Sequence, residues 1–264
     1  MVKQIGFYDR ANTLHFTSVL ASVDAEQCYD AVNHTYGSVA LQAHGVPAVY
    51  AVLYLSTIAY MVFHLKTGFG RDAEGFGGTA CNPMNGLAQG SGASPSTWSN
   101  VSSLMVSAYK RKGYGVNYTT AWSELVFVIA AILFVDDCDL LHMCCDPNIP
   151  EMEFLERVQH ATYYWAKLLQ ATGGMLKESK CFWYLLSYKF VHGEAKLRRL
   201  RELPHYELVI PQHSGVDAVI KLLDVGHAAE TLGVFTSPLS DPNPARIHFR
   251  RTQQLQKLVD KGLD

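Results

Sequence analysis

Two adjacent carboxylates, Asp136 and Asp137, follow an uncharged and largely apolar run at residues 125–135. A shorter apolar segment comes after them, so the pattern predicts a hydrophobic hairpin with the two acids at its tip. Like charges held side by side repel each other unless a cation lies between them and their partners. Hard divalent cations with oxygen ligands are the usual solution, whereas an isolated Asp-Asp pair is more often a solvated turn.

A third acid, Asp24, follows a run of β-forming residues at 16–23, which predicts a position at the end of a buried strand. Tyr29 lies five positions later, where we expect a helix to begin. The alternative role for Asp24 is the N-cap of that helix.

A glycine-rich loop at 86–95 separates these acids. Its last residues, Ser94 and Pro95, are of the types that cap and begin a helix. Glycine lets the backbone approach a substrate closely, which gives Gly90 and Gly92 a physical role, and an ordinary turn is the alternative.

In chain order, these segments resemble motifs A, B and C of reverse transcriptases, in the form carried by non-LTR retrotransposons and group II introns. Two later segments, 173–184 and 231–235, are similar to motif D and to the strand called motif E. The residues that carry the resemblance are Asp24, Tyr29 and Asp30; Gln89, Gly90, Ser94 and Pro95; and Phe134, Val135, Asp136 and Asp137.

The resemblance implies an RNA-directed DNA polymerase that joins dNTPs to the 3′-hydroxyl of a DNA primer on an RNA template. Two Mg²⁺ ions, or Mn²⁺ in their place, would clamp the attacking and leaving oxygens. Asp24 and Asp136 match the bridging metal ligands of the family, and Asp137 matches a weaker third ligand. Lys180 matches the motif D lysine, which is proposed to protonate the leaving group; a surface lysine is the alternative.

The same resemblance gives the nucleotide site. Ala25 would contribute only its backbone carbonyl, and Gln89 and Gly90 match the loop beside the incoming nucleotide and the templating base. Tyr29 matches the sugar gate, where an aromatic ring excludes a ribose 2′-hydroxyl; a core aromatic is the alternative. RNA-dependent RNA polymerases place an acid there and usually glycine before the paired acids, where this chain has Val135.

The elements that must position these residues occur in the order strand, helix, hairpin, helix, strand. This order is typical of an α+β, ferredoxin-like polymerase palm with an antiparallel sheet backed by helices. We assign 1–200 to the palm with motifs A to D, and 201–264 to a motif E-like strand, a linker and a basic terminal helix. Because few residues precede Asp24 and few follow motif E, we interpret the chain as a truncated fragment with fingers and thumb largely missing.

Residues 46–65 carry no formal charge and have the length of a membrane span. Several tyrosines and a histidine interrupt the segment, and no positive cluster precedes it. A core helix packed under the palm sheet is therefore the preferred interpretation.

The 264 residues, 48% of them hydrophobic, can bury a sizeable core, and the net charge of −2 gives no general affinity for nucleic acid. Positive charge is instead local, at 110–112, 196–201 and 246–257, and could face a duplex. The six cysteines lack a Cys-x2-Cys pair, which indicates reduced thiols. With no secretory signal visible, we expect an intracellular protein, cytoplasmic or nuclear, that binds no membrane.

Three functions stay open at this point. The first is the polymerase palm, and the second is a catalytically dead remnant that binds metal and nucleic acid weakly. The third is a different magnesium-dependent phosphotransferase or nuclease built on clustered acids. Primer extension on RNA separates the first two, and nuclease activity without incorporation indicates the third.

Overall fold

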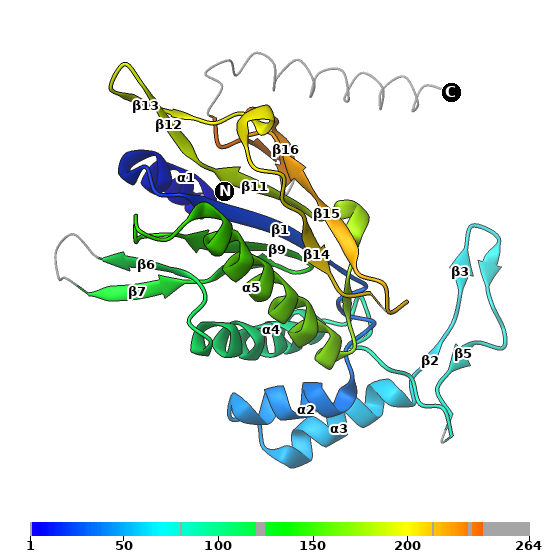
Figure 1. The fold of residues 1–264 in the computed structure, drawn as a ribbon. Helices are drawn as coiled ribbons and strands as arrows, with labels where there is room; N and C mark the ends of the chain where they lie inside the picture. The colour runs from blue at the N-terminus through cyan, green and yellow to red at the C-terminus, as the bar shows by residue number, and fades with distance from the viewer. Residues whose placement is uncertain (1, 80, 120–124, 213, 232–233, 240–264) are drawn as a thin grey trace.

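A computed structural model describes residues 2–79, 81–119, 125–212, 214–231 and 234–239. A mixed sheet lies at its centre, with strands in the order β14-β15-β11-β1-β9-β8 and a short β10 paired with the end of β1 (Figure 1). The strands of this sheet are β1 (Ser18–Glu26), β8 (Ala131–Phe134), β9 (Asp137–Met143), β10 (Met175–Leu176), β11 (Phe182–Leu186), β14 (Leu208–Ile210) and β15 (Ala218–Leu223). The α-helices are α1 (Val2–Leu14), α2 (His34–Ala43), α3 (Ala48–Ala59), α4 (Ser94–Arg111) and α5 (Glu151–Thr172).

The fold is of the α+β class, as predicted, but its sheet is not wholly antiparallel. β11 and β15 run parallel, while the other neighbours in the sheet are antiparallel. Parallel neighbours need a long crossover connection, and residues 187–217 supply one. This connection contains the hairpin of β12 (Tyr188–Val191) and β13 (Glu194–Leu197), and then β14.

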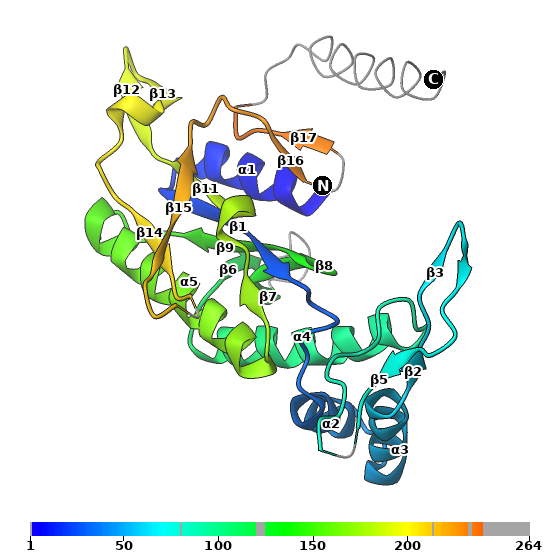
Figure 2. The ribbon, with the colours of Figure 1, turned by 90° about the vertical axis from the view of Figure 1, so that its right-hand side faces the viewer.

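Side chains alternate along β1, the central strand, so both faces of the sheet carry apolar residues. Helices cover both of these faces. Val19, Ala21 and Val23 point to the face covered by α4 and α5, and they belong to the main core. Leu20 points the other way and packs with Phe7 of α1 in a second core. Figure 2 shows α1 and α5 on opposite sides of β1.

The helix expected after the acidic hairpin is present as α5. Pro150 precedes its first turn, and Gly173 ends it with a left-handed φ of 103°. A Cβ at Gly173 would lie 2.2 Å from the carbonyl oxygen of Ala31, so no other residue fits this position without a shift of the backbone.

The predicted apolar hairpin is more complex than expected. The run before Asp136 forms two strands, β7 (Val126–Ile129) and β8, which are separated at Ala130. β7 pairs with β6 (Val116–Thr119), whereas β8 pairs with β9. The run therefore leaves one partner strand and joins another at Ala130, whose carbonyl accepts a hydrogen bond from the amide of Leu141 (3.1 Å).

The uncharged segment does not lie under the sheet, so that expectation is wrong. Its helical part, α3, packs against α2, and α2 packs against α4. Figures 1 and 2 show α2 and α3 together at one end of the molecule. The two short hairpins that follow α3 consist of β2 (Val62–Phe63) with β5 (Phe76–Gly77) and β3 (Lys66–Thr67) with β4 (Gly70–Arg71). None of the helices in the described part of the chain combines the length and the apolar character needed to cross a membrane.

The segment expected to hold a single motif E-like strand forms a hairpin instead. β16 (Ala229–Thr231) pairs antiparallel with β17 (Val234–Thr236), and residues 232–233 between them lie outside the described part. The basic terminal helix expected at 246–257 also falls outside the described residues, as does most of the linker before it.

Candidate functional site

At the end of β1, two of the predicted acids are neighbours on adjacent strands. Asp24 and Asp137 are directly opposite each other in the antiparallel pairing of β1 with β9. Directly opposite residues project their side chains from the same face of a sheet, so both carboxylates belong to one face. The backbone amide of Ala25 donates to the carbonyl of Asp136 (2.9 Å), which ties the acidic turn to β1. The structure therefore brings Asp24, Asp136 and Asp137 together.

The turn between β8 and β9 is tight and strained. Phe134 pairs with Asp137, so only Val135 and Asp136 form the connection. Val135 has a φ of 56°, a conformation that costs a β-branched residue about 1–3 kcal/mol. The indole nitrogen of Trp98 in α4 donates to the carbonyl of Val135 (2.6 Å) and offsets part of this cost.

Negative charge is concentrated at this turn. Burial raises the pKa of the Asp137 carboxyl, and the charges of Asp136 and Asp24 raise it further. Burial and the charge of Asp136 also raise the pKa of the Cys28 thiol, to about 12. A carboxylate cluster of this kind favours any nearby cation.

Lys180 supplies such a cation in this structure. It ends a short 3₁₀ turn, η1 (Glu178–Lys180), and its Nζ lies 2.9 Å from Oδ2 of Asp24. This hydrogen bond and the charge of Asp24 raise the pKa of Lys180. The amide of Lys177 also donates to the carbonyl of Asp24 (2.9 Å), so the motif D-like segment is anchored at the same strand end.

The donor chemistry of the three acids fits a hard divalent cation, because carboxylate oxygens are the ligands that Mg²⁺ prefers. Within the described residues, however, no three side chains of Asp, Glu, His or Cys are arranged to hold one metal ion. Lys180 already pairs with Asp24. Metal binding would therefore require Lys180 to leave and the carboxylates to reorient.

Tyr29, the predicted sugar gate, lies close to the acids. Its ring packs edge-on against Trp98, with 6.5 Å between ring centroids, and the side chain is half-buried. Burial raises the pKa of the Tyr29 phenol, with smaller contributions from Cys28 and Asp136. Tyr29 thus has the contacts of a core aromatic and a position beside the acidic turn, although it lies in a turn and the following helix, α2, begins only at His34. Its role as a sugar gate stays a prediction.

The glycine-rich loop is attached to the segment that carries Tyr29. The amide of Leu87 donates to the carbonyl of Tyr29 (2.7 Å), while Gln89 and Gly90 are exposed beyond it. Within the protein, the glycine of this loop that needs the absence of a side chain is Gly86, where a Cβ would lie 2.5 Å from the carbonyl oxygen of Asp30. At Gly90 a Cβ would meet nothing within 4 Å, but its φ of 94° still favours glycine.

Two residues have roles that differ from those expected. Ser94 does not cap α4; it is the first helical residue, and its hydroxyl donates to the carbonyls of Leu87 and Ala88 (2.9 Å to Ala88), which closes the loop. Trp98 was not among the residues assigned to the site from the sequence, so its hydrogen bond to the acidic turn was missed. The signal was available, because the N–H of a buried indole needs a partner.

Two arginines of the basic run at 196–201 are engaged in ion pairs. Arg198 pairs with Glu151 (3.0 Å), and Arg199 pairs with Asp224 (2.7 Å). These cations hold β13 and the following turn against α5 and β15, which reduces their availability to a phosphate backbone.

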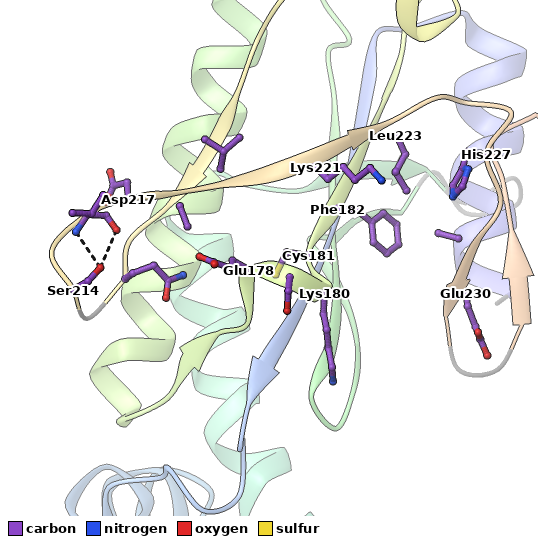
Figure 3. A pocket seen from close by; sticks show the side chains of 16 residues that line it. Glu178, Lys180, Cys181, Phe182, Ser214, Asp217, Lys221, Leu223, His227 and Glu230 are labelled. Carbon is purple, nitrogen blue, oxygen red and sulfur yellow. Dashed lines mark hydrogen bonds between the residues drawn. The ribbon is translucent and has the colours of Figure 1, made fainter.

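A cavity of about 820 Å³ opens beside Lys180 (Figure 3). Phe182 and Lys221 line it, and they are neighbours in the parallel pairing of β11 with β15. Ser22 lies opposite Phe182, which places this row of side chains on the face that carries Asp24, two residues further along β1. The walls carry both signs of charge, from Lys180 and Lys221 to Glu178, Asp217 and Glu230.

No protein-family model matches this chain, and no curated protein is similar to it. Among solved structures, telomerase from Candida albicans in complex with a TWJ fragment of telomeric RNA matches with a TM-score of 0.43 and 16% sequence identity. The match covers 68% of this chain and 29% of the telomerase chain, so this chain spans less than a third of that protein's length.

Proposed function

We propose that this chain is the palm of an RNA-directed DNA polymerase, which transfers dNTPs to the 3′-hydroxyl of a primer by two-metal catalysis. The observation that carries the proposal is the pairing of Asp24 with Asp137 across β1 and β9, together with the hydrogen bond from Ala25 to Asp136. Carboxylates more than a hundred residues apart in the sequence thereby share one strand end, in the motif order described above.

Asp24 and Asp136 would hold the two Mg²⁺ ions, with Asp137 as a weaker ligand. When bound, the ions would activate the attacking oxygen and neutralise charge on the leaving pyrophosphate. Lys180, once released from Asp24, would hold or deliver a proton at the leaving group. Its present contact with Asp24 supports this role, because the ammonium already lies within hydrogen-bond distance of a proposed ligand.

The surroundings of the acids would select the nucleotide. Tyr29 would exclude a ribose 2′-hydroxyl through the bulk of its ring, which Trp98 holds in place. Gln89 and Gly90, exposed at the end of the anchored loop, would contact the incoming nucleotide and the templating base. RNA template and DNA primer would lie at the strand end that carries Asp24, beyond the part of this face that α1 covers.

A second candidate function is a remnant that binds metal and nucleic acid weakly without turnover. The ion pair between Lys180 and Asp24 favours it, because the lysine takes the place of a cation at the proposed ligand. In that case Lys180→Met would strengthen Mn²⁺ binding and yield no synthesis. In a polymerase the same substitution would strengthen Mn²⁺ binding but slow incorporation.

Primer extension on an RNA template with Mg²⁺ or Mn²⁺ tests the proposal, with Mn²⁺ binding measured in parallel by electron paramagnetic resonance. We expect Asp136→Asn to abolish extension and to weaken Mn²⁺ binding by about tenfold or more. Glu194→Gln is the matched control, because Glu194 is an exposed acid on the β12–β13 hairpin, and it should leave both signals unchanged.

The outcomes separate the candidates. Mn²⁺ binding that depends on Asp136 without any extension would indicate the remnant. Cleavage of nucleic acid without incorporation would indicate a nuclease. Mn²⁺ binding that Asp136→Asn and Glu194→Gln affect equally would remove the metal site and the polymerase proposal with it.

A further inference from the structure

The end of α4 and the middle of α5 together form a positively charged surface. Lys110, Arg111 and Lys112 are consecutive and exposed where α4 ends. The Nζ of Lys112 lies 5.7 Å from the ring centroid of Tyr164 on α5. Lys167 is exposed three residues after Tyr164, and residues with this spacing are neighbours on a helix. The four cations therefore share one surface, here called the α4–α5 basic surface.

The segments that form this surface contain no carboxylate to balance the cations. The sequence has no Asp or Glu between Glu74 and Glu124, a span that includes all of α4, and none between Glu156 and Glu178. Within the described residues, none of the four cations takes part in an ion pair. Because the whole chain has a net charge of −2, the α4–α5 basic surface is a local concentration of positive charge.

Aromatic rings hold two of the lysines in place. Lys112 lies over Tyr164, and the Nζ of Lys167 lies 5.5 Å from the ring centroid of Tyr163. Tyr164 is in turn supported from the core by Tyr109, whose ring is stacked on it with 6.5 Å between centroids. A cation–π contact restricts the side chain of a lysine, so less conformational entropy is lost when its ammonium binds an anion.

The uncharged part of this surface is polar. Ser99, Ser103 and Ser107 are exposed along α4, and the last of them is one turn from Lys110 and Arg111. Among the described residues, none of the exposed large apolar side chains belongs to α4 or to residues 153–172. A helix that enters lipid needs such side chains, and a protein–protein contact usually has an apolar centre. Cations and hydroxyls without apolar neighbours suit phosphate groups instead.

We propose that the α4–α5 basic surface binds the backbone of single-stranded RNA, at a site separate from the acidic turn. Arg111 lies about 20 Å along α4 from Trp98, whose indole contacts that turn. Helices α4 and α5 also cover the face of the sheet opposite to the one that carries Asp24 (Figure 1). The RNA held here is therefore a different segment from the one that would pair with a primer at the acids.

The choice of RNA has two grounds. The hydroxyls of Ser103 and Ser107 can hydrogen-bond a ribose 2′-hydroxyl, which DNA lacks. The choice also rests on the proposed function, because a chain that copies RNA must accommodate template outside the site of synthesis. A flexible single strand can follow two crossing helices, and its contacts with lysine and arginine make binding depend on salt.

Fluorescence anisotropy of the whole chain with a labelled oligouridine of roughly 20 nucleotides tests the inference, in EDTA so that no divalent ion bridges RNA to the acids. We expect a dissociation constant in roughly the micromolar range at about 50 mM salt. The double variant Lys110→Gln/Arg111→Gln should bind about tenfold more weakly, and the slope of log K against log salt should fall by about 0.7 for each cation removed.

The matched control is Lys66→Gln/Arg71→Gln, which removes the same two charges from the exposed β3–β4 hairpin. It should change the affinity by less than about twofold, because Asp72 and Glu74 already offset those cations. Far-ultraviolet circular dichroism verifies that each variant is folded. Equal loss of binding in the two double variants would overturn the proposal.

Photocrosslinking of RNA that contains 4-thiouridine locates the bound strand. We expect crosslinks in residues 110–118 and 160–167, and crosslinks confined to the strand end at Asp24 would overturn the proposal. So would tighter binding of oligothymidine than of oligouridine, or binding of poly-glutamate or anionic vesicles in preference to RNA. RNA binding that depends on Lys110 and Arg111, in a chain that performs no primer extension, would contradict the proposed function and leave this surface assigned.

Discussion

The sheet and the α2–α3 pair are both built from largely apolar segments, but they bury the apolar side chains to different extents. In the sheet, alternation along β1 sends apolar residues to two cores and leaves Asp24 and Asp137 together at the strand end. In α3, apolar residues occupy both sides of one helix, and only one side is covered. The comparison shows that hydrophobicity predicts burial only where a neighbouring element supplies a second surface.

The largest expected effect on stability comes from truncating one buried leucine, with one exposed leucine as its matched partner. Leu140, in β9 between the sheet and the helices, is fully buried, whereas Leu53 in α3 is 64% exposed. Leu140→Ala should lower the free energy of unfolding by about 2–5 kcal/mol, because it removes buried methyl groups and leaves a cavity. Leu53→Ala should change it by less than about 0.5 kcal/mol. Urea denaturation measures both, and equal losses would contradict the distinction.

A pair of glycine substitutions tests the two regions at their turns. Gly173 and Gly45 both have positive φ, but a Cβ meets the carbonyl of Ala31 at Gly173 and nothing within 4 Å at Gly45. Gly45→Ala should cost about 1 kcal/mol, for the left-handed backbone alone. Gly173→Ala should cost about 2–3 kcal/mol, because the backbone of α5 must also shift. Thermal unfolding ranks the two, and an equal cost would show that the Gly173 turn relaxes freely.

The smallest expected effect is a pH dependence that belongs to the sheet alone. The pKa of Asp137 is raised in the folded state by burial and by Asp136 and Asp24, so folded protein binds this proton more tightly than unfolded chain does. Ionised Asp137 therefore destabilises the fold as pH rises above its ordinary pKa of 3.8. Asp137→Asn should be more stable than wild type at neutral pH, by less than about 1 kcal/mol because the group is half exposed.

The behaviour of the same variant at low pH provides the control. The advantage of Asp137→Asn should disappear as pH falls below 3.8, where both states of the wild type carry the proton. The α2–α3 pair contains no carboxylate, so a pH-dependent gain there, detected by amide hydrogen exchange, would contradict the assignment to Asp137.

Local patterns in the sequence predicted much of the sheet and of the acidic site. Strand β1 follows from a run of β-forming residues, and the hairpin at Asp136 follows from an uncharged run that ends in two acids. Helix α5 follows from an apolar stripe with helical spacing after Pro150. The predictions that failed concern features that depend on residues far apart in the sequence. The parallel pairing of β15 with β11 has no local signature, and the location of α3 depends on which surface α2 offers. The arginines at 198 and 199 were likewise assigned from a basic run, although Glu151 and Asp224 engage them from other elements.

The order of strands in the sheet also bears on how the chain is made. The partners of β1, β9 and β11, are translated more than a hundred residues after it. During that interval a strand rich in valine, leucine and alanine has both edges open to other chains. Nascent polypeptide should therefore be prone to aggregate and should depend on chaperones, so lower temperature and slower translation should raise the yield of soluble protein.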